Sequence, residues 1–123
     1  MFYYRIKTGS IYQNETWLGT GYSGKGKTLP EGRNNPDMIT RKGMGPIPPG
    51  EYEIGIPYSH ENLGPCVMNL DPLLGTVTFG RSLFRIHGNN AINDASHGCI
   101  ILGPAIREKI AKSGDKYLTV SIE

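Results

Sequence analysis

The chain has 123 residues, and its thirteen Lys and Arg nearly balance eleven Asp and Glu, which leaves a net charge of +2. A chain of this length buries roughly two thirds of the surface that its unfolded form exposes, so we expect one domain with one packed core over residues 1–123. The absence of basic runs argues against nucleic-acid binding, and the absence of any apolar stretch near the ~18 residues of a membrane span argues against membrane insertion.

Seventeen Gly and nine Pro separate short apolar runs without an internal repeat, a pattern typical of short strands joined by turns. Near the N-terminus, alternating bulky and polar residues predict two successive hairpins built from residues 2–7, 11–13 and 16–18. Trp17 and the neighbouring tyrosines could stack on a sugar. Aromatic residues in amphipathic strands more often serve core or cross-strand packing, and we adopt that interpretation.

The segment 19–49 has no regular pattern, and an irregular segment of this size inside a small domain is usually functional or mobile. Residues 21–27 are rich in Gly and Lys but lack the G-x-x-x-x-G-K-[ST] spacing and precede no helical pattern, so we expect no nucleotide site. Arg33 is a candidate for lining a substrate groove, because binding residues are often carried on loops.

Further apolar runs predict strands at 51–56, 66–70 and 76–79. Glu51 and Glu53 share a face of the first of these strands, and we interpret that face as the solvated one. Cys66 is expected to be a small core hydrophobe.

One helix is predicted at about 104–113, with Pro104 in its first turn, Ile106 and Ile110 as its apolar stripe and Gly114 as its stop. An alternating, β-branched run at 117–122 predicts a closing strand. The fold expected from these patterns is mainly β, with one short helix packed on a sheet.

The stretch 83–102 carries the residues with the clearest chemistry. Its apolar runs at 83–86 and 100–102 flank a polar loop, and His87 lies twelve residues before Cys99. A cysteine is a nucleophile only as thiolate, and with a pKa of about 8.5 it needs a base or cation beside it. If the two runs pair or lie adjacent, they bring His87 to Cys99.

His97 lies two residues from Cys99, so it also qualifies as the base, and position alone does not decide between the two histidines. Gly98 between them permits a tight backbone whose N–H groups could face a reacting carbonyl oxygen. Ser96 could orient one of the histidines.

The same residues allow a metal interpretation, in which His60, His87, His97 and Cys99 would bind zinc. Their spacing does not follow a known zinc pattern, and we place this alternative behind the thiol enzyme. A non-catalytic cell-wall-binding or phage structural β domain is the alternative from another class of proteins.

His87 followed by S-H-G-C at 96–99 resembles the signature of YkuD-type L,D-transpeptidases, and I-P-P-G-E-Y-E-I at 47–54 resembles the segment that precedes it there. The closer resemblance is to small L,D-transpeptidase-like toxins delivered by bacterial type VI secretion. These share G-P-I-P-x-G-x-Y, a histidine-glycine pair, a shortened loop and S-x-G-C-I. With G-Y-S-G at 21–24, the resemblance spans most of the chain.

The resemblance implies that Cys99 is the nucleophile and His87 its base, and that a backbone carbonyl or side chain near Gly88 orients the imidazole. It implies an oxyanion hole made by the backbone amides of Gly98 and Cys99. It further implies a β-sandwich-like, mostly antiparallel sheet with a helix against it, in agreement with the strand pattern.

Ser96 and His97 are expected to shape the site. The residues that we expect to contact the substrate are Tyr22, Ser23, Arg33 and Asn89.

The implied reaction is L,D-transpeptidase or L,D-carboxypeptidase chemistry on peptidoglycan tetrapeptide stems, through an acyl-enzyme and with neither metal nor cofactor. Only eight residues separate His87 from Ser96, and Ile100–Leu102 replaces the arginine or asparagine usual after the cysteine in YkuD domains. Both departures favour the toxin-like branch.

Residues 1–8 show no Sec-type signal pattern. We therefore expect a protein made in the cytoplasm that acts in the target-cell periplasm after export or delivery. Its expected partners are peptidoglycan stem peptides, a secretion machinery and an immunity protein.

Overall fold

The computed structural model describes all of residues 1–123, and most of its regular structure is β. Its strands are β1 Phe2–Arg5, β2 Ser10–Gln13, β3 Thr16–Thr20, β4 Tyr22–Ser23, β5 Gly50–Ile54, β6 Tyr58–His60, β7 Gly64–Pro72, β8 Arg85–His87, β9 Ile100–Ile101 and β10 Tyr117–Ser121. The helices are α1 Pro104–Lys112 and two single 3-10 turns, η1 Leu29–Glu31 and η2 Pro36–Met38. The mainly β prediction is confirmed.

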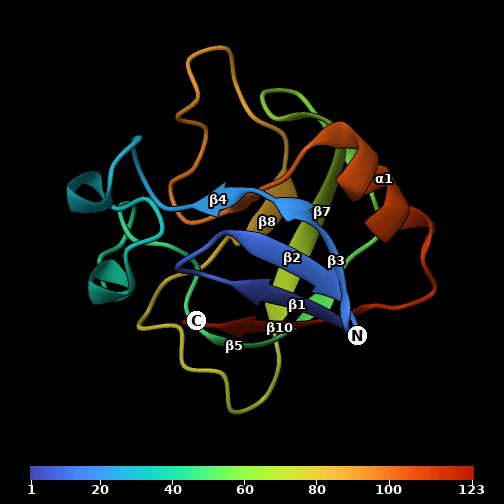
Figure 1. Cartoon of the computed structure of the whole chain (residues 1–123), viewed down its shortest axis with the longest axis horizontal. Helices are drawn as coiled ribbons and strands as arrows, with labels where there is room; N and C mark the ends of the chain where they lie inside the picture. Colours follow the sequence, from blue (N-terminus) through green and yellow to red (C-terminus); the bar gives the residue numbers. More distant parts are fainter.

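The strands form one sheet that curls into a nearly closed barrel (Figure 1). The order is β3-β2-β1-β10-β5-β7-β8-β9-β4, with β6 attached to β7. The first and last strands in this order, β3 and β4, are consecutive in the chain and are separated only by Gly21. The Gly21 N–H donates to the Gly9 carbonyl oxygen, and a Cβ at Gly21 would overlap the Ile101 carbonyl oxygen. Glycine is therefore required where the barrel closes.

Two of the strand pairs are parallel, β1 with β10 and β8 with β9, so the sheet is mixed although most of its pairs are antiparallel. The first brings the N-terminus beside the last strand, and the second joins the two ends of the loop that carries the cysteine.

Period-two alternation decides which side chains enter the barrel. In β1, Phe2 and Tyr4 are fully buried, whereas Tyr3 and Arg5 face outward. The core is a cluster of seventeen buried apolar residues, within which Tyr52 meets Phe84 edge to face at 5.9 Å. Trp17 is 59% exposed and lies opposite Tyr12 in the β2–β3 register, so it serves cross-strand packing on the outer face.

Helix α1 lies against the sheet next to β7 (Figure 1), as predicted for 104–113. Pro104 occupies its first turn, and Ile110 is buried while Ile106 packs against the core. The helix ends at Lys112, two residues before the predicted stop, and the N–H of its C-cap Ser113 donates to the carbonyl oxygens of Lys109 and Ile110.

Three local predictions were wrong. Residues 76–79 form no strand, because Val77 and Phe79 are exposed and Phe79 has a φ of 58°. The short strands β4 and β6 lie in segments for which no strand was predicted, and each makes only a brief pairing, with β9 and β7 respectively.

No helix combines the length and the apolar character needed to cross a bilayer.

Candidate active site

The parallel pairing of β8 with β9 brings the two ends of the polar loop together. Ile86 lies opposite Ile100 and His87 opposite Ile101, and the Leu102 N–H donates to the His87 carbonyl oxygen at 3.1 Å. His87 ends β8, whereas Cys99 immediately precedes β9. The two predicted arms therefore pair, and because His87 lies opposite Ile101, it is offset from Cys99 by two residues along the strands.

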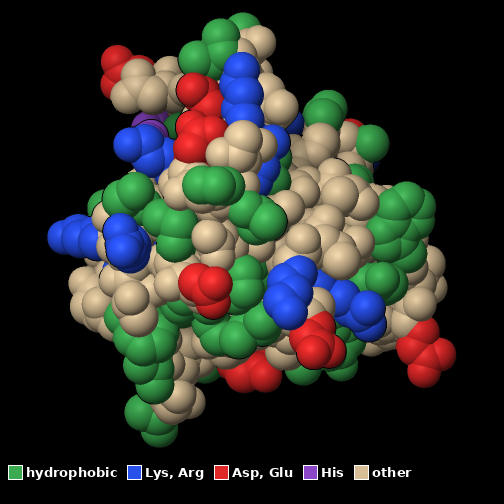
Figure 2. Space-filling model, turned by 60° about the vertical axis from the view of Figure 1, so that its left-hand side comes forward, with side chains coloured by type: hydrophobic (Ala, Val, Ile, Leu, Met, Phe, Trp, Pro, Cys, Tyr) green, Lys and Arg blue, Asp and Glu red, His purple; other side chains and the backbone are tan.

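Both residues line one cavity of about 290 Å³. Its walls are formed by Lys42, Gly43, Leu63, Arg81, Ser82, Leu83, Phe84, Arg85, His87, Ala95, His97, Gly98 and Cys99. Several of these residues are exposed, so the cavity opens to the surface. The walls carry two arginines and a lysine but no Asp or Glu, which favours an anionic ligand. Over the face drawn in Figure 2, basic, acidic and hydrophobic side chains are interspersed.

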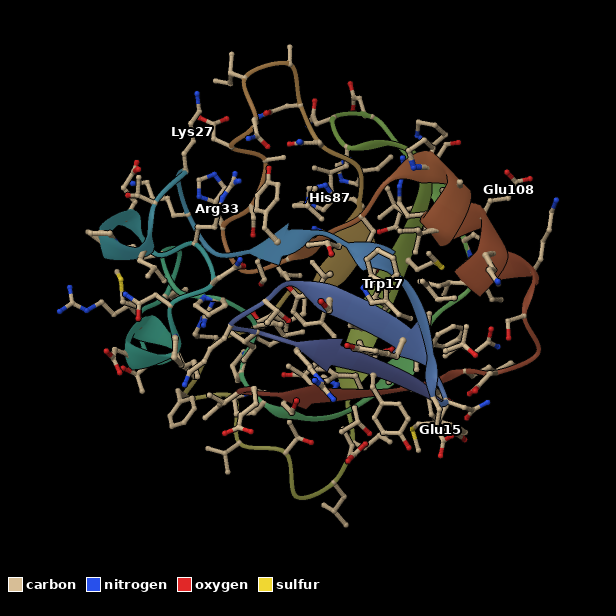
Figure 3. The ribbon with its side chains drawn as sticks, in the orientation of Figure 1. Glu15, Trp17, Lys27, Arg33, His87 and Glu108 are labelled. Atoms are coloured by element: carbon tan, nitrogen blue, oxygen red, sulfur yellow. The ribbon has the colours of Figure 1, made fainter.

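His87 is 2% exposed and lies beneath the loop that joins β8 to β9 (Figure 3). Its Nδ1 lies 2.9 Å from the Gly88 carbonyl oxygen. A carbonyl oxygen only accepts hydrogen bonds, so the proton of the neutral ring is on Nδ1 and Nε2 has a free lone pair. Burial lowers the pKa of His87 below its ordinary value of 6.5, which keeps the ring neutral at pH 7.

The Cys99 thiol is half-buried over the chain that enters β8. Its Sγ donates a long hydrogen bond of 3.7 Å to the Leu83 carbonyl oxygen. Burial raises the pKa of Cys99 above its ordinary value, and this is opposed by the Arg85 backbone N–H and by the charges of Arg85 and Arg81. No hydrogen bond joins Cys99 to His87. The resting site therefore holds a neutral thiol and a neutral imidazole.

Ser96 organises the turn before the cysteine. Its buried Oγ donates to the Cys99 carbonyl oxygen at 2.7 Å and accepts from the N–H groups of Gly98 at 3.1 Å and Gly24 at 2.9 Å. It does not orient either histidine. Of the two amides in the expected oxyanion hole, the Gly98 N–H is bonded to Ser96, and the Cys99 N–H has no partner.

Ser23 is fully buried and is not among the residues that line the cavity, where we expected it to contact a substrate. Its Oγ donates to the Gly98 carbonyl oxygen at 3.3 Å and accepts from the Ile47 N–H at 2.9 Å. Ser23 thus links the G-Y-S-G and G-P-I-P segments to the turn that carries the nucleophile.

The other three expected substrate contacts, Tyr22, Arg33 and Asn89, lie together but outside the cavity walls. The Tyr22 hydroxyl donates to Asn89 Oδ1 at 2.6 Å and accepts from the Ala95 N–H at 2.8 Å. The Arg33 guanidinium stacks 3.5 Å from the Tyr22 ring centroid and donates to the Asn93 carbonyl oxygen (Figure 3 shows Arg33 beside β4). These contacts clamp the 88–96 loop that covers His87.

His97 is exposed on the cavity wall, with its Nδ1 3.4 Å from the Gly43 carbonyl oxygen. The His60 ring instead accepts the N–H groups of Asn62 and Leu63 within its own turn. No three His, Cys, Asp or Glu side chains are grouped so that they could hold a metal ion. The zinc set of His60, His87, His97 and Cys99 is therefore not assembled, because strand pairing leaves His60 in a separate turn.

Sequence reasoning missed two buried arginines, Arg81 on the cavity wall and Arg107 outside it. Arg81 is 5% exposed and lies against Gly98, and Arg107 is 7% exposed and lies against Gly88. Arg81 follows an irregular segment, where nothing marks a buried charge. Arg107 lies three residues before Ile110 on α1, so helical spacing alone could have placed it on the inner face.

A protein-family model described as the Tlde1 domain matches residues 19–120. No curated protein and no solved structure matches the chain.

Proposed function

Because the chain belongs to the Tlde1 domain family, which implies an L,D-transpeptidase-like domain, we propose that it is a cysteine-dependent enzyme acting on peptidoglycan stem peptides. In this proposal Cys99 is the nucleophile and His87 is its general base. The observation that carries it is the β8–β9 pairing. It places the unprotonated Nε2 of His87 and the thiol of Cys99 on the walls of one open cavity that contains no Asp or Glu.

The neutral resting pair favours general-base activation over a preformed ion pair. The Cys99 S–H bond breaks as the sulfur attacks the carbonyl carbon of the third, L-centred residue of a tetrapeptide stem, and the proton passes to His87 Nε2. The C–N bond to the terminal D-alanine then breaks, and that proton leaves with the D-alanine amine. A thioester joins Cys99 to the remaining stem.

Negative charge develops on the carbonyl oxygen during the attack, and unpaired amides stabilise such charge. The Cys99 N–H fits this role because it has no partner in the structure. The Gly98 N–H contributes only after leaving Ser96 Oγ, to which it is bonded at 3.1 Å. Ser96 therefore acts by holding the turn.

The acceptor of the acyl group determines the product. Water gives L,D-carboxypeptidase trimming, a D-amino acid gives exchange, and the amine of a second stem gives a cross-link. The three reactions share the thioester and the Cys99–His87 pair.

The biological setting is part of the same proposal. Membership in this family favours a type VI secretion effector that acts on the peptidoglycan of a target bacterium. The partners that this role requires are the secretion machinery and an immunity protein that protects the producing cell.

Purified tetrapeptide muropeptides incubated with the protein test this function by mass spectrometry. The wild type is expected to release D-alanine from the stem, to exchange it, or to form dimers, and Cys99→Ala is expected to do none of these. Cys66→Ala is the matched control, because Cys66 packs against the core and does not line the cavity. Unchanged tetrapeptides with the wild type would contradict the proposal, as would full activity of Cys99→Ala. Loss of activity with a chelator would favour a metal enzyme.

A further inference from the structure

Arg81, in the loop between β7 and β8, has no role in the reaction described above. Its guanidinium donates to three backbone carbonyl oxygens, through Nη1 to Ile39 at 2.6 Å and Pro46 at 2.7 Å and through Nη2 to Gly45 at 2.9 Å. A planar guanidinium is suited to such a fork of acceptors, which a lysine cannot span. Arg81 thereby fixes the chain on one side of the cavity.

The same guanidinium touches the turn that carries the cysteine. A Cβ at Gly98 would lie 2.5 Å from Arg81 Nη2, so the guanidinium lies directly against the Gly98 backbone. Gly98 has a φ of 134°, which other residues rarely adopt. Close approach of Arg81 and backbone conformation therefore both require glycine before Cys99.

Arg81 is a buried cation without a carboxylate partner. The two ion pairs of the protein join Met1 to Asp115 and Lys112 to Glu108, and no Asp or Glu lines the cavity. A buried charge is costly unless it is paired or well hydrogen-bonded, and carbonyl dipoles supply only part of that compensation. Burial lowers the pKa of Arg81, whereas charge on Tyr52 or Cys99 opposes that shift. An anion at Cys99 would meet this uncompensated charge together with that of Arg85 on the same cavity wall, which also lowers the pKa of the thiol.

We propose that Arg81 is a positioning residue that packs against the Gly98 backbone and, beside Arg85, supplies positive charge that stabilises the Cys99 thiolate. When the S–H bond breaks, the proton leaves to a base and the electron pair stays on sulfur, where the guanidinium stabilises it. The proposal rests on the nucleophilic role of Cys99 for its biological meaning. Its test concerns the thiol alone.

Arg107 provides a matched control. It is also a buried arginine bonded to carbonyl oxygens, with Nε donating to Leu102 at 3.0 Å and Nη1 to Pro65 at 2.7 Å. A Cβ at Gly88 would lie 2.8 Å from Arg107 Nη2, so Arg107 lies beside the glycine that follows His87. Its charge lowers the pKa of His87 but is not among the influences on Cys99.

The experiment measures the rate of alkylation of Cys99 by iodoacetamide from pH 6 to pH 10, in a Cys66→Ala background so that only one thiol reacts. Arg81→Gln is expected to raise the pKa of the thiol by about one unit and to slow alkylation at pH 7 about tenfold. Arg107→Gln is expected to keep the profile of the parent protein. If Arg81 had only a structural role, Arg81→Gln would lower the melting temperature without changing the pKa of the Cys99 thiol.

Arg81→Lys separates charge from hydrogen bonding, because it keeps the charge but not the fork. It is expected to lower the melting temperature while keeping the alkylation rate within about threefold of the parent. A folded Arg81→Gln protein with the parental profile would overturn the proposal. A folded Arg81→Lys protein whose alkylation is slowed tenfold would also overturn it. This second variant tests the proposal even if Arg81→Gln does not fold. Peptidoglycan is absent from the assay, so this outcome is independent of activity on stems.

Discussion

The Ser96 hydroxyl donates a hydrogen bond to the Cys99 carbonyl oxygen at 2.7 Å and so fixes the backbone of Cys99. The Ser96 Oγ in turn accepts hydrogen bonds from the N–H groups of Gly24 and Gly98. This fully buried side chain therefore ties the turn 96–99 together and joins it to the segment at Gly24. In the serine-histidine-glycine-cysteine motif, the serine is thus a structural anchor for the turn.

Ser96→Ala is expected to lower the free energy of unfolding by about 2 kcal/mol, because two buried amides lose their acceptor. Urea denaturation monitored by circular dichroism measures this change. Ser59→Ala is the control, since Ser59 is exposed, and it is expected to change stability by less than about 0.5 kcal/mol. Equal stability of Ser96→Ala and wild type would contradict the anchoring role.

His87→Gln is expected to reduce kcat/KM on tetrapeptide stems by about 10²- to 10⁴-fold, the usual contribution of a general base. In the wild type, protonation of the ring removes the base, so activity falls on the acid side. Because burial lowers the pKa of His87 below 6.5, that fall is expected at a pH below 6.5. A kcat/KM profile with its acid limb above pH 6.5 would contradict the assignment of the base.

The same ionisation affects stability with a defined sign. The folded state holds His87 neutral, so the unfolded chain binds more protons on the acid side. The contribution of His87 to stability is therefore present above pH 6.5 and is lost as the pH falls through that value toward the lower folded-state pKa. His87→Gln removes this dependence. Urea midpoints of wild type and variant at several pH values separate this effect from activity.

The sequence pattern predicted the helix and the strands around the site, because the alternation of apolar and polar residues and the capping of a helix are local properties. The register of β8 against β9 follows from packing of the whole barrel, so the sequence alone could propose that His87 and Cys99 meet but not by which pairing. Short strands such as Tyr22–Ser23 carry too few residues to show a period. Arg81 was missed because its partners are main-chain carbonyl oxygens, which have no signature in a sequence.

Gly21→Ala tests the closure of the barrel. Its added methyl group would overlap the carbonyl oxygen of Ile101 in β9, the strand that follows Cys99. We therefore expect the free energy of unfolding to fall by more than about 2 kcal/mol. Gly103→Ala is the matched control, because nothing lies within 4 Å of its Cβ position. Thermal unfolding of both variants provides the comparison. Equal melting temperatures would mean that β3 and β4 are not held as closely as the structure describes.

The central claim is that Cys99 attacks the stem and carries the acyl group, and intact-protein mass spectrometry after brief mixing with tetrapeptide stems tests it most directly. The account predicts that the wild type gains the mass of the stem minus D-alanine, that peptide mapping locates the thioester on Cys99, and that Cys99→Ser and His87→Gln accumulate little or no adduct. Release of D-alanine with no adduct at any mixing time, or an adduct on another residue, would contradict it.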